Sequence, residues 1–128
     1  MFIGESGENY LEAIYILERE QGFVRSIDVA GFLGVTKPSV SRAMSNLKAT
    51  ALVEMAADGG LSLTEAGRTL AKSVFERHQL ITDFLVSLGV SRETAAEDAC
   101  RMEHVISQET FDCLKEYAKQ QIGEAQNV

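Results

Sequence analysis

The sequence has 128 residues, of which 45% are apolar and 24% are charged. These values fit an ordinary globular chain and exclude collagen-like, coiled-coil and disordered proteins. No apolar run approaches the roughly 18 residues that a membrane helix needs, and the first nine residues show no signal peptide. With only two cysteines, we expect a cytoplasmic protein that has no disulfide framework and no membrane partner.

The net charge of −7 is unevenly distributed along the chain. Residues 1–51 hold five Lys and Arg against six Asp and Glu, whereas residues 76–128 hold five against ten. The segment Thr36–Val53 has no acidic residue and carries Lys37, Arg42 and Lys48. A local basic segment in an acidic chain indicates a restricted nucleic-acid-binding surface joined to a part with another role.

Helical periodicity and capping residues predict a mainly α fold. Ser or Thr precedes most of the periodic segments, where a hydroxyl can cap a first turn, and glycines follow several of them. The predicted helices span residues 7–20, 27–33, 37–49, 65–88, 92–105 and 108–120. Three apolar stripes predict the buried faces: Tyr10, Ile14 and Leu17; Val29, Phe32 and Leu33; and Val40, Met44 and Leu47.

One segment breaks the helical pattern and predicts a β-hairpin. The short apolar runs Leu52–Met55 and Leu61–Leu63 flank Asp58–Gly60, whose glycines supply the positive φ angles of a hairpin loop. Helices 27–33 and 37–49 are joined by a short turn that contains a glycine, as in a helix-turn-helix. With the hairpin behind them as a wing along the DNA, they predict a winged helix-turn-helix.

The first turns of helix 37–49 form the candidate DNA-reading surface. Small hydroxyls and backbone N–H groups at a helix N-terminus suit phosphates, and an arginine can bond a guanine edge twice. An ordinary helical pair with a solvated basic face is the alternative, but the acid-free segment and the hairpin favour DNA binding. The candidate DNA-binding residues are Thr36, Lys37, Pro38, Ser39, Ser41, Arg42 and Lys48.

Cys100, Glu103 and His104 form a second candidate site. Positions i, i+3 and i+4 share one helix face, and a thiolate, a carboxylate and an imidazole together suit a transition metal. His78 lies in the preceding predicted helix, which must fold back at Gly89, so it could complete the set. A buried cysteine beside two surface residues would give the same pattern, and the spacing alone leaves both interpretations open.

Five segments resemble the diphtheria toxin repressor family of iron- and manganese-dependent bacterial repressors, in order and spacing, from about Tyr10 to Leu114. They are Glu8–Tyr15, Gly34–Ser41, Leu63–Gly67, Arg77-His78 and Asp98–Val105. The resemblance implies a winged helix-turn-helix DNA-binding domain at residues 1–75. It implies a helical dimerisation and metal-binding domain at residues 76–128, without an SH3-like domain. A homodimer on a pseudo-palindromic double-stranded DNA operator is the expected assembly.

The resemblance also implies a set of metal ligands. The ligands shared by the iron and manganese branches of the family are matched by His78, Glu103 and His104. Glu12 matches a ligand of the manganese branch, and Cys100 matches one of the iron branch. Asn9 stands where the manganese branch usually has Asp and the iron branch has Met, and it is a further candidate. We therefore expect Fe²⁺ or Mn²⁺ as the cofactor, among other divalent transition metals.

The predicted function is a metal-dependent transcriptional repressor that controls metal homeostasis and is not an enzyme. One alternative is a metal-independent or redox-sensing winged-helix regulator in which Cys100 is oxidised. Reversal of DNA binding by a chelator, as opposed to a reductant, separates these two. A metalloenzyme with an open Cys, Glu and His site is the other alternative, and metal-dependent hydrolysis would reveal it.

Overall fold

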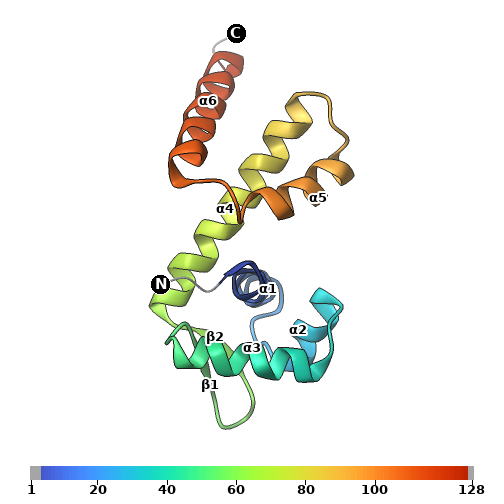
Figure 1. Cartoon of the computed structure of the whole chain (residues 1–128), viewed down its shortest axis with the longest axis vertical. Helices are drawn as coiled ribbons and strands as arrows, with labels where there is room; N and C mark the ends of the chain where they lie inside the picture. The colour runs from blue at the N-terminus through green and yellow to red at the C-terminus, as the bar shows by residue number, and fades with distance from the viewer. Residues whose placement is uncertain (1–3, 127–128) are drawn as a thin grey trace. The chain divides into compact units, whose positions relative to one another are not determined.

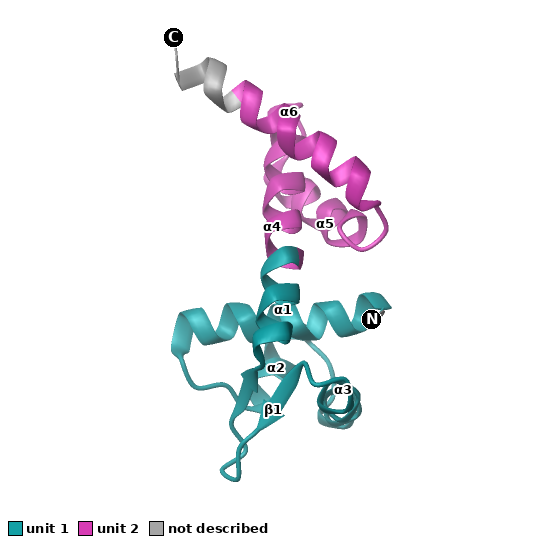
Figure 2. Cartoon of the chain, turned by 90° about the vertical axis from the view of Figure 1, so that its left-hand side faces the viewer, with its two compact units in different colours: residues 1–73 teal, residues 74–128 magenta. Residues whose placement is uncertain are grey.

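The structure is a computed structural model that describes the backbone of residues 4–126 and the side chains of residues 4–121. Its elements are α1 (Gly4–Gln21), α2 (Ser26–Leu33), α3 (Lys37–Ala49), β1 (Val53–Met55), β2 (Leu61–Leu63), α4 (Glu65–Ser87), α5 (Arg92–Met102) and α6 (Gln108–Gln126), as Figure 1 shows. The predicted mainly α fold with one hairpin is confirmed. The chain divides into two compact units, unit 1 (residues 1–73) and unit 2 (residues 74–128), coloured separately in Figure 2.

The hairpin of unit 1 is short and antiparallel. Val53 pairs with Leu63, and Met55 pairs with Leu61, which also bridges to Val24 after α1. The loop bends at Gly59, whose φ of +86° lies in the left-handed region that glycine adopts at no steric cost. The two strands thereby extend the core of the three helices with one apolar face.

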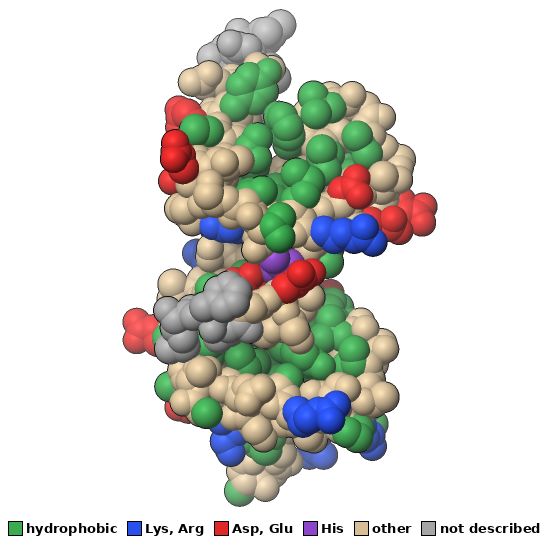
Figure 3. All heavy atoms as spheres, viewed as in Figure 1, with side chains coloured by type: hydrophobic (Ala, Val, Ile, Leu, Met, Phe, Trp, Pro, Cys, Tyr) green, Lys and Arg blue, Asp and Glu red, His purple; other side chains and the backbone are tan. Residues whose placement is uncertain are grey.

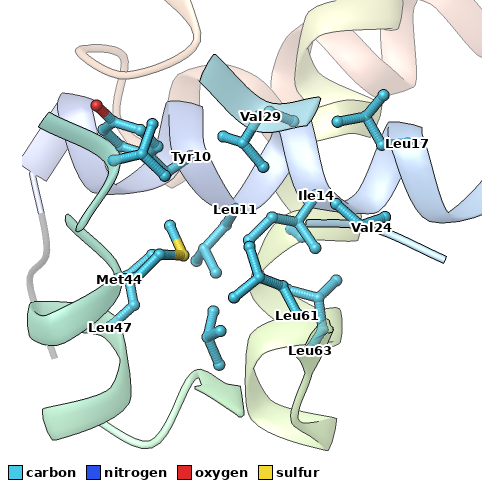
Figure 4. Close-up of a cluster of buried hydrophobic side chains, with 14 of the residues drawn as sticks. Tyr10, Leu11, Ile14, Leu17, Val24, Val29, Met44, Leu47, Leu61 and Leu63 are labelled. Carbon is cyan, nitrogen blue, oxygen red and sulfur yellow. The ribbon is translucent and has the colours of Figure 1, made fainter. Parts of the chain in front are cut away.

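Figure 4 shows that the side chains of this core come from α1, α2, α3 and the hairpin and point toward one another. Two of the three predicted stripes are buried as expected: Tyr10, Ile14 and Leu17 on α1, and Val40, Met44 and Leu47 on α3. The prediction for α2 is wrong at Phe32, which is 46% exposed. In α2, Val29 is buried as predicted and Leu33 is half-buried against the core, whereas Ala30 is buried in place of Phe32. An eight-residue helix covers the core with little more than two turns.

Several helix ends differ from the predicted ones. α1 begins earlier, at Gly4, and α6 continues to Gln126. α5 ends at Met102, three residues before the predicted end. There the main chain tightens, since the N–H of His104 donates to the carbonyl of Arg101 at 3.4 Å, an i to i−3 bond typical of a last turn. No helix within the described residues is long and apolar enough to cross a bilayer.

Gly67, in the first turn of α4, allows that helix to approach the start of the hairpin. The Thr64 hydroxyl donates to the Ala51 carbonyl at 2.7 Å and accepts from the Gly67 N–H at 3.0 Å. A Cβ built on Gly67 would lie 1.9 Å from the carbonyl oxygen of Leu52. Main-chain atoms therefore occupy the place of any larger side chain at this position.

Gly67→Ala should lower the free energy of unfolding by about 1–3 kcal/mol, the usual cost of overpacking, because backbone must move to admit the methyl group. Gly31→Ala is the matched control, since Gly31 lies inside α2 with no positive φ and with nothing within 4 Å of the place that a Cβ would take. That control should be neutral or stabilising by about 0.5–1 kcal/mol. Urea unfolding of both variants checks this, and equal stabilities would contradict the contact.

Candidate DNA interface and metal centre

The turn between α2 and α3 places the start of α3 at the surface of unit 1. Gly34 ends α2 with a φ of +68°, and its N–H donates to the carbonyl of Ala30. Thr36 caps α3, because its Oγ1 accepts from the Ser39 N–H at 3.3 Å. The two hydroxyl oxygens of Thr36 and Ser39 lie 2.9 Å apart and share a hydrogen bond. These predicted DNA-binding residues thus also hold the helix end in shape.

The other predicted DNA-binding residues all carry exposed side chains on α3, namely Lys37, Pro38, Ser41, Arg42 and Lys48. Ser39 is half-buried by its contact with the cap. Ser45 is also exposed, three and four residues after Arg42 and Ser41, so it belongs to the same helix face. Ser45 was not among the predicted residues, although the periodicity that identified the buried stripe also predicts the face opposite to it.

The wing differs in charge from α3. Residues 53–63 contain Glu54 and Asp58 and no Lys or Arg. Both acidic side chains are exposed. Since DNA phosphates are contacted by cations, the basic side chains of the candidate interface lie on α3 and not on the hairpin.

Arg42→Ala should weaken binding to specific DNA by about 1–3 kcal/mol and relax the preference at one base pair, because a bidentate contact is lost. Lys48→Ala should weaken binding to all sequences and reduce the salt dependence by about one phosphate contact. Fluorescence anisotropy with specific and scrambled duplexes over a salt series measures both. An unchanged affinity and selectivity of Arg42→Ala would show that α3 is docked wrongly.

In unit 2, two of the predicted metal ligands lie close to the carboxylate of a third, Glu103. His78 lies on α4, Glu103 follows the last residue of α5, and His104 comes next. The Nδ1 atom of His78 lies 2.9 Å from Oε2 of Glu103. The Nε2 atom of His104 lies 3.3 Å from the other carboxylate oxygen, Oε1. Glu103 is 1% exposed, so its carboxylate is buried between two imidazoles.

The chemistry of this group fits a divalent cation. Burial of a carboxylate is costly unless a cation or several hydrogen bonds compensate it. Glu103 Oε1 has no described donor in hydrogen-bond geometry. Imidazole nitrogens and carboxylate oxygens together suit Mn²⁺ and Fe²⁺. As the side chains stand, however, the residues that the structure describes include no group of three or more His, Cys, Asp or Glu positioned to hold a metal ion.

The other candidate ligands are placed differently. Cys100 is exposed in the last turn of α5. α5 ends at Met102, and Glu103 follows it as the helix cap, with helical φ and ψ angles of −60° and −23°. Asn9 and Glu12 lie three residues apart on α1 in unit 1, and both are half-buried.

Two family models match consecutive parts of this chain. The model described as "Iron dependent repressor, N-terminal DNA binding domain" matches residues 3–61. The model described as "Iron dependent repressor, metal binding and dimerisation domain" matches residues 64–120. The chain belongs to the iron-dependent repressor family. The predicted family, the winged-helix fold class and the function as a metal-dependent transcriptional repressor are thereby confirmed.

The proteins that this chain resembles include regulators named for iron or manganese. The transcriptional regulator MntR of Escherichia coli O6:H1 is 43% identical over 108 residues, which cover 84% of this chain and 70% of that protein. The iron-dependent repressor IdeR of Mycobacterium bovis is 37% identical over 106 residues, covering 82% of this chain and 46% of that protein. The structure of the manganese regulator SloR matches with a TM-score of 0.80 and 28% identity, over 93% of this chain and 55% of SloR. This chain thus spans about half the length of that solved structure.

Proposed function

We propose that this protein binds DNA and represses transcription as a homodimer when it holds Fe²⁺ or Mn²⁺, and that it catalyses no reaction. The observation that carries this proposal is the buried Glu103 carboxylate between the imidazoles of His78 and His104. When bound, the ion would supply the positive charge that compensates this carboxylate. The ligands that we assign are Glu12, His78, Cys100, Glu103 and His104, with Asn9 as a further oxygen donor.

Metal binding regulates DNA binding in this proposal through a shift of populations. A ligand changes a conformational equilibrium only by its different affinity for the states. The ligands that we assign would therefore hold the ion more tightly in dimers whose two α3 helices can bind DNA together. Two such helices would meet major grooves about 34 Å apart, or a multiple of that, on a pseudo-palindromic operator.

The dimer contact is assigned to unit 2. The family model of the dimerisation domain covers most of unit 2. Three large apolar side chains of unit 2 are exposed, namely Leu88 (66%), Val105 (76%) and Tyr117 (51%). Exposed apolar surface of this kind often marks a contact with another protein. An apolar groove of about 500 Å³ runs between α4 and α6 and is lined by Leu80, Phe84 and other residues. On the face shown in Figure 3, hydrophobic side chains gather over these helices.

The choice between the two metals depends on Cys100 and Asn9. A thiolate is a soft ligand and favours Fe²⁺, Co²⁺ or Zn²⁺ over Mn²⁺. Asn9 brings an amide oxygen without charge, which attracts the hard Mn²⁺ ion less than a carboxylate would. Glu12 opposes both effects with a hard carboxylate. We therefore propose activation by Fe²⁺ at least as strong as activation by Mn²⁺.

The proposal predicts that DNA binding needs a divalent ion. Anaerobic titrations of operator-like DNA with Fe²⁺, Mn²⁺ and Zn²⁺, with protein-bound metal measured in parallel, should show binding that follows metal content. A chelator should reverse binding, whereas a reductant should not, because the signal is the metal and not an oxidised Cys100. Equal DNA affinity with and without bound metal would contradict the proposal, and reversal by the reductant alone would favour a redox sensor.

The double variant Cys100→Glu, Asn9→Asp forms the second arm of this titration. It offers carboxylates at both positions and should lower the half-maximal Mn²⁺ concentration relative to that of Fe²⁺. If the ratio of the two concentrations is the same in both proteins, Cys100 and Asn9 do not set the metal preference.

A further inference from the structure

Arg77 of α4 makes a set of contacts that the proposed function does not use. Its Nη1 donates to the carbonyl oxygens of Glu103 at 3.2 Å and Ile106 at 3.4 Å. Its Nη2 donates to Oε1 of Gln108 at 2.6 Å. The guanidinium carbon lies 5.1 Å from the ring centroid of Phe111, in cation–π range. One side chain of α4 thus reaches the end of α5, the connecting loop and the first turns of α6.

Two of these contacts satisfy main-chain carbonyl groups, one at the cap of α5 and one in the loop that follows it. The last carbonyl groups of a helix have no donor within the helix, and a cation close to them is favoured by the helix dipole. An arginine carries five N–H donors in a planar fork, so it can bond several oxygens at once without changing its conformation. Arg77 therefore holds the loop of residues 103–107 in one place against α4.

Two consecutive residues of α4 contact Glu103, one at its main chain and one at its side chain. Arg77 bonds the main-chain carbonyl, and the Nδ1 of His78 lies 2.9 Å from the carboxylate. On its other side, the Glu103 N–H donates to the carbonyl of Ala99 at 2.9 Å. The position of the carboxylate relative to the His78 ring thus depends on a main-chain contact made by Arg77, which is not itself a metal ligand. His104 is the next residue in the chain.

We propose that Arg77 is a positioning residue for the metal ligands Glu103 and His104. This inference rests on the proposed function. Before any ion is bound, Arg77 fixes the main chain at Glu103, so that the Glu103 carboxylate lies next to the His78 ring. A site whose donors are already ordered loses less conformational entropy on binding, so its affinity is higher. Sequence reasoning gave Arg77 no role, because its contact with Glu103 is made to a main-chain oxygen, which no spacing reveals.

The test measures Mn²⁺ affinity of the full chain without DNA, from the spectrum of the free ion in electron paramagnetic resonance. Arg77→Met removes every donor, and Arg77→Lys keeps the charge but loses the fork. We expect the dissociation constant to rise about tenfold or more in Arg77→Met, the range known for partners that orient metal ligands, and by less in Arg77→Lys. Arg92→Met is the matched control, since its contact with Asp83, at 3.5 Å, joins two exposed side chains of unit 2. It should leave the affinity unchanged.

A second readout separates positioning from a general loss of structure. Amide hydrogen exchange of residues 103–107 in the metal-free protein should be faster in Arg77→Met than in wild type, while exchange in the core of unit 1 stays the same. At saturating Mn²⁺, the variant should recover wild-type DNA affinity, because α3 is untouched. A purely structural role would instead lower DNA affinity at every Mn²⁺ concentration.

The outcomes are distinguishable from failure of the proposed function. If wild type itself binds no Mn²⁺ and no Fe²⁺, the proposed function fails and this inference fails with it. If wild type binds metal and Arg77→Met binds it equally tightly, the positioning role alone is overturned. Should Arg77→Met not fold, Arg77→Lys decides: weaker Mn²⁺ binding supports the role, and an unchanged dissociation constant overturns it.

Discussion

A carboxylate with almost no access to water is the constraint on which the functional account depends. Glu103 is 1% exposed and lies between two imidazole nitrogens, at 2.9 and 3.3 Å. Burial of a carboxylate is costly unless a cation or several hydrogen bonds compensate its charge. The arrangement is therefore better suited to a state in which a cation is present, which links the stability of this region to metal. The contacts of Arg77 to the main chain preserve the arrangement while no cation is there.

In unit 1, one face of α3 is buried in the core and the opposite face is exposed. The apolar faces of its helices are buried in one core, in which Leu11, Ile14 and Val40 have no exposed surface. The opposite face of α3 is left polar and basic, at a helix N-terminus that Thr36 and Ser39 keep in shape. We expect DNA binding to be confined to this small basic surface, because the chain has a net charge of −7 and acidic residues elsewhere repel DNA phosphates.

The sequence predicted the helices and the hairpin well because local signals specify them. Thr36 and Ser91 cap α3 and α5 as their hydroxyls suggested. The stripe on α2 failed at Phe32 because tertiary packing, not periodicity, decides which side of a short helix is covered. His78 and Glu103 were predicted as partners, but their contact depends on how α4 and the end of α5 meet. Spacing could not show that α5 stops before Glu103, nor that Arg77 bonds its carbonyl.

The central claim, that Glu103 is held ready for a divalent ion, is tested most directly by Glu103→Gln. This change keeps the shape of the side chain and removes its charge. Mn²⁺ binding to the full chain, measured without DNA, should weaken by about 100-fold or more, beyond the loss typical of residues that only orient a ligand. The metal-free protein should be as stable as wild type or more so, because a buried charge is gone. Glu109→Gln, at an exposed position of α6, is the control. Wild-type Mn²⁺ affinity in Glu103→Gln would contradict the account.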